Sequence, residues 1–185
     1  VMAGEWTTDY FRFWRCKETL LEFDYHEIDE ATGRHFQEIY EEELENITML
    51  DEMRMTLEFL KEKGVSMGII TNGPTEHQLK KVRKLGLYDY IEPGHVLVSQ
   101  ATGFQKPEKE IFNLAAEQFG MNPATTLYVG DSYDNDVVGA KTSGWQAMWF
   151  NHRGRTLKPG TKPVYDVAID SFEQLFGAVK ILFDL

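Results

Sequence analysis

The chain changes character after Gly64, and this change constrains its fold more than any other feature. Beyond Gly64, short runs rich in apolar and β-branched residues alternate with stretches of helical periodicity. Such alternation is typical of βαβ units, which build a parallel sheet covered by helices. We predict strands at residues 65–71, 95–98, 126–129, 146–150 and 167–169, and helices at residues 75–85, 109–119, 134–143 and 171–183.

The residues before this alternation show only helical patterns. Residues 8–23, 28–47 and 51–63 each repeat apolar side chains at helical spacing, and Thr7 or Thr8 suits the cap of the first helix. We therefore predict two domains. A small helical cap spans residues 1–48, and an α/β core with a Rossmann-like, doubly wound parallel sheet spans residues 49–185.

The charge balance restricts the class of partner. The 185 residues carry 19 basic and 30 acidic side chains, a formal net charge of -11. Such an acidic chain argues against a nucleic-acid polymer or an anionic membrane as partner. No segment approaches the roughly 18 consecutive apolar residues of a membrane span. Cys16 is the single cysteine, which excludes an intrachain disulfide and favours a cytoplasmic location, while the oligomeric state is not readable.

Three loops of the predicted sheet carry groups that suit phosphate chemistry. One strand ends at Thr71, the segment after the next strand reaches Lys106, and a third strand is followed by Asp131. Because the carboxyl ends of parallel strands meet at one edge of a sheet, we expect these groups to lie together. A hydroxyl, a lysine and a carboxylate supply the positioning and charge neutralisation that phosphoryl transfer needs.

Asp131 also begins an acidic cluster that continues with Asp134 and Asp136. Carboxylates suit Mg²⁺, which takes one or two of them and shares its other positions with water and substrate phosphate. A structural role is the alternative, since Asp131 and Ser132 can cap the next helix and the other acids can complement its dipole. Likewise, residues 71–74 make a good turn on composition alone.

Together these stretches resemble the haloacid dehalogenase superfamily, in its subgroup with a small helical cap. Residues 69–73 look like its second motif, Lys106-Pro107 like the third and residues 130–140 like the fourth. The resemblance implies an aspartate nucleophile that attacks a phosphomonoester, with Mg²⁺ between the two and water hydrolysing the aspartyl-phosphate. Residues 71–74 and 10–15 are similar to those of nucleotidases that act on pyrimidine monophosphates.

The resemblance gives each matching residue a role. The implied substrate is a small phosphorylated metabolite that the sequence does not identify. The catalytic residues would be Thr71, Lys106 and Asp131; the phosphate would be bound by Thr71, Asn72, Gly73 and Lys106; and Mg²⁺ would be held by Asp131 and Asp136.

The first motif of the family, a strand that ends in Asp-x-Asp, is missing from these residues. Residues 22–26 carry a histidine in place of the second aspartate, and the run that ends at Asp184 has helical periodicity. In the family this strand lies between those ending at Thr71 and Asp131, and its loss would leave two unpaired edges, at about 1–3 kcal/mol per uncompensated group. We expect the strand to precede Val1, and the chain without it to be inactive.

Three functions remain open at this point. The leading one is a Mg²⁺-dependent phosphomonoesterase, with a nucleotidase as its more specific form. A second is a phosphosugar mutase or a dehalogenase on the same scaffold, although dehalogenation needs no metal and the acidic cluster argues against it. The third is a non-catalytic descendant that binds phosphate or Mg²⁺ and acts through partners.

Overall fold

The computed structural model describes residues 7–26 and 28–183. The chain divides into two compact units, Val1–Ile47 and Thr48–Leu185. No helix within the described ranges is both long and apolar enough to cross a bilayer. Asp184, the aspartate of the C-terminal run, lies outside the described residues.

The smaller unit is a pair of packed helices, α1 (Thr8–Leu21) and α2 (Glu30–Leu44). Each helix begins with a side chain that accepts a backbone hydrogen bond from its first turn, Thr7 for α1 and Asp29 for α2. The predicted cap of the first helix is therefore Thr7 rather than its neighbour. The second helix ends before residue 47, the predicted end.

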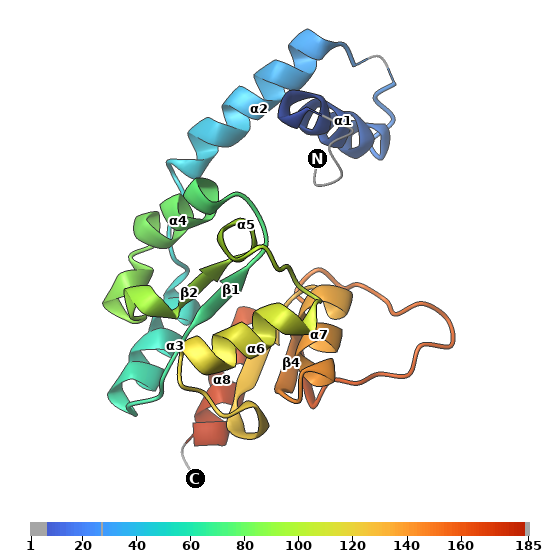
Figure 1. Ribbon diagram of the computed structural model, residues 1–185. Coiled ribbons are helices and arrows are strands. Elements are labelled where there is room, and N and C mark those ends of the chain that lie inside the picture. Colours follow the sequence, from blue (N-terminus) through green and yellow to red (C-terminus); the bar gives the residue numbers. More distant parts are fainter. Residues whose placement is uncertain (1–6, 27, 184–185) are drawn as a thin grey trace. The chain divides into compact units, whose positions relative to one another are not determined.

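The larger unit has the α/β fold that the sequence predicts (Figure 1). Its strands are β1 (Ile69–Thr71), β2 (Val96–Val98), β3 (Leu127–Gly130), β4 (Gln146–Phe150) and β5 (Val167–Ile169). Its α-helices are α3 (Asp51–Glu62), α4 (Thr75–Lys84), α5 (Ser99–Thr102), α6 (Lys109–Gln118), α7 (Gly139–Thr142) and α8 (Phe172–Phe183). Short 3₁₀ turns lie at Leu87–Asp89, Pro93–His95 and Pro123–Thr125, and a π-helical turn lies at Tyr133–Val138.

Every strand pair is parallel, but the strands form two sheets. In the first, β1 pairs with β2 and Thr71 lies opposite Val98. In the second, the order is β3-β4-β5 and Gly130 lies opposite Trp149. Within the described residues no ladder joins β1 to β3. Parallel strands with helical connections are thus confirmed, and the two sheets are separated at the position where the sequence predicts the absent strand.

Helices cover both faces of the strands, and β4 shows how the core is divided. Ala147 and Trp149 pack in one cluster with residues of α6 and α7, whereas Met148 and Phe150 pack in another with residues of α3 and α8. This alternation follows from the two-residue period of a strand. Figure 1 shows α6 in front of the strands and α8 behind them.

Two predicted elements differ in the structure. The first strand begins at Ile69 rather than at residue 65, because residues 65–68 pair with no neighbouring strand and instead line a pocket. The helix predicted at 134–143 begins as a π-helical turn, in which the carbonyl of Ser132 accepts from the backbone N–H of Asp136 at 2.8 Å and of Val137 at 3.4 Å. Such widened turns are frequent at functional sites.

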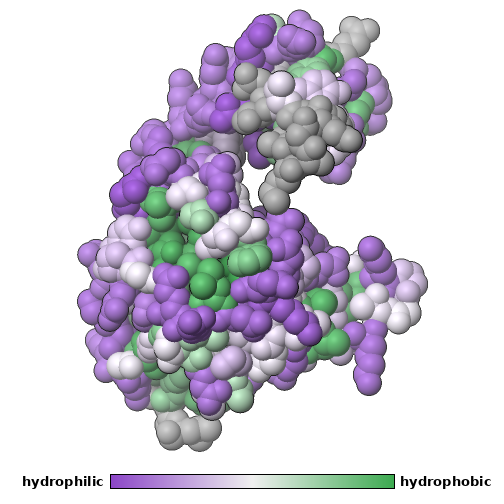
Figure 2. Space-filling model, viewed as in Figure 1, coloured by the Kyte–Doolittle hydropathy of each residue, from purple (hydrophilic) through white to green (hydrophobic). Residues whose placement is uncertain are grey.

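Figure 2 shows hydrophilic residues over most of this view, with hydrophobic side chains partly uncovered on the larger unit. The whole chain of 185 residues has a formal net charge of -11. An anionic substrate therefore needs a local cation at its binding site.

Asp166 gives the larger unit a testable dependence on pH. Burial opposes its charge, but hydrogen bonds from Lys141 Nζ at 2.8 Å and from the N–H of Ala147 at 2.7 Å outweigh burial, and the pKa of Asp166 lies below its usual value. The folded state thus prefers the ionised form, so its contribution is complete above about pH 4 and is lost as the pH falls through the lower, folded pKa.

We therefore expect Asp166→Asn to be less stable than the natural chain at neutral pH, and the gap to narrow below about pH 4. Urea unfolding of both proteins across this range measures the gap. A gap that stays constant with pH would show that the charge of Asp166 does not stabilise the fold.

Candidate active site

Lys106 lies in the loop before α6, and its ammonium group is buried between two partners. Nζ donates to Asp136 Oδ1 at 2.6 Å and to the hydroxyl of Tyr128 at 3.0 Å. The side chains of Lys106 and Asp136 are only 13% and 5% exposed. A buried pair of this kind is costly to break, because either partner alone would be an uncompensated charge.

Asn72 ties the loop after β1 to this lysine. Its side-chain amide donates to the carbonyl of Lys106 and accepts from the N–H of Lys106, both at 2.9 Å. Gln78 in α4 holds the same loop by donating to the carbonyl of Asn72 at 3.0 Å. The structure thus brings together the loop that follows Thr71 and the loop that carries Lys106.

Asp136 fixes the turn that follows β3. Its second oxygen, Oδ2, accepts from the N–H of Ser132 at 2.9 Å, so one carboxylate links this turn to Lys106. The side chain lies directly over Gly130, where an added Cβ would overlap Asp136 Cβ and Cγ. Glycine is therefore required at position 130 for the carboxylate to reach Lys106.

Tyr128 joins the two sheets through its side chain. Burial, reinforced by the charge of Asp136, holds the pKa of the phenol well above its usual value, so the hydroxyl keeps its proton. The hydroxyl donates to the carbonyl of Ile70 in β1 at 3.1 Å and accepts from Lys106. This contact connects β3 to β1, between which the described part of the chain has no strand.

Asp131 is the exposed acid of the site. Its backbone carbonyl accepts from the indole N–H of Trp149 at 3.2 Å, which fixes the turn to β4. Its carboxylate Oδ2 lies 3.6 Å from Nε of Arg153, and the side chain is 38% exposed. Asp131 is therefore accessible, whereas Asp136 is enclosed by Lys106 and Ser132.

The donor set is compatible with Mg²⁺ but does not form a complete cage. Within residues 7–26 and 28–183, no three His, Cys, Asp or Glu side chains gather closely enough to hold a metal ion. Mg²⁺ needs only one or two carboxylates when water and substrate phosphate complete its shell. Asp131 offers one accessible carboxylate of this kind, and Asp136 lies in the same turn.

In the predicted phosphate-binding turn, some backbone N–H groups already donate hydrogen bonds to side chains of the protein. Thr71 is half-buried at the end of β1. The N–H of Gly73 donates to Ser99 Oγ at 3.0 Å, and the N–H of Thr75 donates to Gln100 at 2.8 Å. These bonds hold the turn against α5, and a phosphate at Gly73 would have to compete with Ser99.

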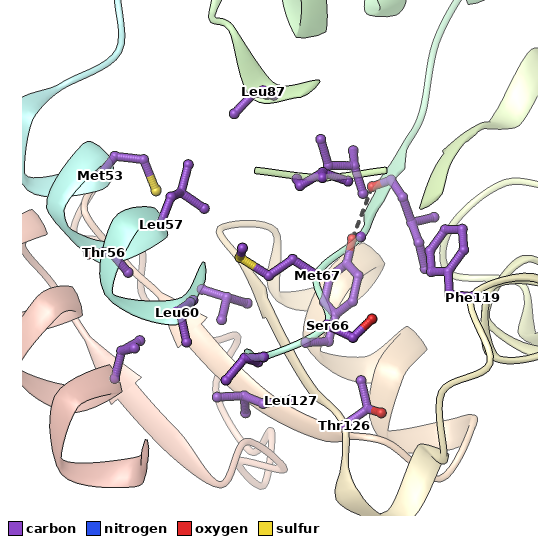
Figure 3. Close-up of a pocket in the computed structure, with 18 of the residues that line it drawn as sticks. Met53, Thr56, Leu57, Leu60, Ser66, Met67, Leu87, Phe119, Thr126 and Leu127 are labelled. Carbon is purple, nitrogen blue, oxygen red and sulfur yellow. Dashed lines mark hydrogen bonds between the residues drawn. The ribbon is translucent and has the colours of Figure 1, made fainter. Parts of the chain in front are cut away.

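An apolar pocket of about 740 Å³ lies where β1 and β3 face each other (Figure 3). Both strands contribute to its lining, with Ile69 and Ile70 from β1 and residues 127–129 from β3. Met53, Leu57 and Leu60 of α3 point toward the same space in Figure 3. The pocket therefore exposes two strand edges and the apolar faces of the helices behind them.

The sequence pointed to Asn72, Lys106, Asp131 and Asp136, but not to two other side chains that shape the site, Tyr128 and Arg153. Tyr128 looked like one more residue of an apolar strand, although a buried phenol needs a partner for its hydroxyl. The two bonds between the Asn72 side chain and Lys106 were not predicted, and neither was the pair between Arg153 and Asp131. Each depends on contacts between residues far apart in the chain.

Comparison with known proteins gives relatives over most of the chain. The family model for haloacid dehalogenase-like hydrolases matches residues 11–150. The glyceraldehyde 3-phosphate phosphatase of Pyrococcus furiosus is 38% identical over 69% of this chain and 52% of its own length. The pyrimidine 5'-nucleotidase YjjG of Escherichia coli is 36% identical over 59% of this chain and 48% of its own length.

Solved structures agree with this placement. The putative hydrolase YfnB of Bacillus subtilis, determined with bound magnesium, aligns over 96% of this chain and 75% of its own, at 29% identity and a TM-score of 0.67. The chain spans about half the length of the phosphatase of Pyrococcus furiosus and of the nucleotidase YjjG. Since the family model matches well over half of the chain, the predicted resemblance is confirmed: this chain belongs to the haloacid dehalogenase-like hydrolase family.

Proposed function

We propose that this chain carries the phosphate-binding part of a Mg²⁺-dependent phosphomonoesterase. One observation carries the proposal: Asn72, Lys106 and Asp136 are linked by hydrogen bonds at one edge of the strands, beside the exposed Asp131. A fixed cation next to an accessible acid suits a phosphorylated substrate on an otherwise acidic protein. The names of the relatives, a phosphatase and a nucleotidase, support this reaction class.

Charge neutralisation is the main task of such a site. A carboxylate brought to 4 Å from a phosphate dianion is opposed by about 8 kcal/mol at an effective dielectric constant of 20. Lys106 would offset this repulsion from the position that Asn72 and Asp136 impose on it. Mg²⁺ held by Asp131, with Asp136 as a further ligand, would supply the remaining positive charge. A relative determined with bound magnesium supports the choice of ion.

The nucleophilic carboxylate is proposed to come from a strand that docks in the pocket between β1 and β3. The pocket offers two strand edges with an apolar lining, as a buried parallel strand requires. A strand parallel to β1 and β3 would end at the edge where Lys106 lies. In the family that the sequence resembles, the nucleophile strand lies between the corresponding strands, which supports the proposal.

The test is phosphate release by the protein with this strand in place, across nucleotides and sugar phosphates. Asp131→Asn is expected to raise the Mg²⁺ concentration needed for half-maximal rate about tenfold or more, because a charged ligand is lost. Asp134→Asn is the matched control, since Asp134 is exposed in the same acidic cluster and the proposal gives it no ligand role. Undiminished release in excess chelator would contradict the proposal.

A further inference from the structure

The two acids assigned to Mg²⁺ each face a cation of the chain, and the two pairs differ in character. Lys106 and Asp136 form a short, buried pair at 2.6 Å. Arg153 and Asp131 form a longer pair at 3.6 Å, with side chains that are 57% and 38% exposed. Exposed pairs of this length contribute little stability and are screened by salt. The first pair is therefore part of the fold, and the second can open without disturbing it.

The turn after β4 is organised in a way that presents Arg153 to Asp131. Asn151 accepts from the N–H of Arg155 at 2.8 Å and donates to the carbonyl of Arg155 at 2.9 Å, which closes the turn around Arg153. Because the last residue of β3 pairs with Trp149, residues just beyond β4 lie beside Asp131. The pair thus results from the register of the sheet and from a hydrogen-bonded turn.

We propose that Arg153 is an internal counter-ion of Asp131 that a divalent cation must displace, and that Arg153 thereby sets the metal affinity of the site. The inference rests on the proposed function in taking Asp131 as a metal ligand. Guanidinium and a divalent cation compete for the same carboxylate, so metal binding includes the loss of the ion pair and the repulsion between two cations. Removing the guanidinium removes both costs.

The test measures metal binding directly, by calorimetric titration with Mg²⁺ and by electron paramagnetic resonance of free Mn²⁺. Arg153→Gln is expected to lower the dissociation constant about two- to fivefold, and Arg153→Lys to keep it near the natural value. Arg155→Gln is the matched control, because it removes the same charge from the same turn while its backbone bonds to Asn151 remain. This control should change the constant less than twofold.

Asp131→Asn separates this inference from the proposed function. If Asp131→Asn abolishes binding but Arg153→Gln binds no more tightly than the natural protein, the counter-ion role is wrong and the metal site stands. If Asp131→Asn binds as well as the natural protein, or if no protein binds either metal, the metal site and the counter-ion role are both wrong. If Arg155→Gln binds the metal more tightly to the same extent as Arg153→Gln, the effect comes from the change in net charge and the inference is overturned.

Discussion

Replacing Lys106 with methionine is expected to lower the free energy of unfolding by about 3–5 kcal/mol and, in the protein that carries the nucleophile strand, to reduce phosphate release at least about a hundredfold. The stability loss follows from the burial of Asp136, whose carboxylate would lose its cation while remaining 5% exposed. The loss of rate follows because the ammonium group is the fixed cation at the proposed phosphate position. Urea unfolding and a phosphate-release assay measure the two effects.

Two further variants keep this prediction testable if the single variant folds poorly. The double variant Lys106→Met with Asp136→Asn should recover much of the lost stability, because no unpaired charge remains, while its activity stays low. Lys109→Met is the matched control, since Lys109 is an exposed lysine in the first turn of α6, and it should change stability by less than about 0.5 kcal/mol. Normal stability in Lys106→Met would contradict the role given to the buried pair.

Adding an N-terminal extension with an apolar strand that ends in Asp-x-Asp is expected to slow amide exchange in β1 and β3 more than tenfold. Each of these strands pairs on one side within the described residues, and a docked strand would make both central. Amides of β4, which already lies between β3 and β5, should change little and serve as the internal reference. Hydrogen exchange followed by mass spectrometry gives the comparison.

Val129→Lys provides the matched control for docking. Val129 lines the pocket and is 39% exposed, so a lysine there leaves the core intact while placing a charge in the path of the strand. The extended protein with this substitution should exchange in β1 and β3 as the unextended chain does. Equal exchange with and without the extension, in the absence of Val129→Lys, would show that the pocket does not accept a strand.

The order of elements was predictable because it depends on local patterns. Apolar runs bounded by Gly64, Gly130 and Gly144 mark where strands and helices change, and parallel connectivity then brings the loops at Thr71, Lys106 and Asp131 to one edge. The shorter first strand was not predictable in this way. Its length depends on pairing across the sheet, which is a tertiary property.

The hydrogen bonds that fix the site could not be predicted from local sequence patterns either. The bond from Tyr128 to Ile70 and the two bonds between Asn72 and Lys106 join residues far apart in the chain. No periodicity or motif spacing encodes which polar groups meet across a fold. The acidic turn was recognised as a candidate site, but the division between an enclosed Asp136 and an exposed Asp131 required the structure.

The most direct test of the account is Mg²⁺-dependent phosphate release from a panel of phosphomonoesters, measured for residues 1–185 and for the same residues with the added strand. We expect no turnover by residues 1–185. With the strand we expect turnover, which is abolished when the first aspartate of the added Asp-x-Asp is changed to asparagine. Mg²⁺-dependent release by residues 1–185 alone would contradict the account, because the nucleophile would then lie within the chain.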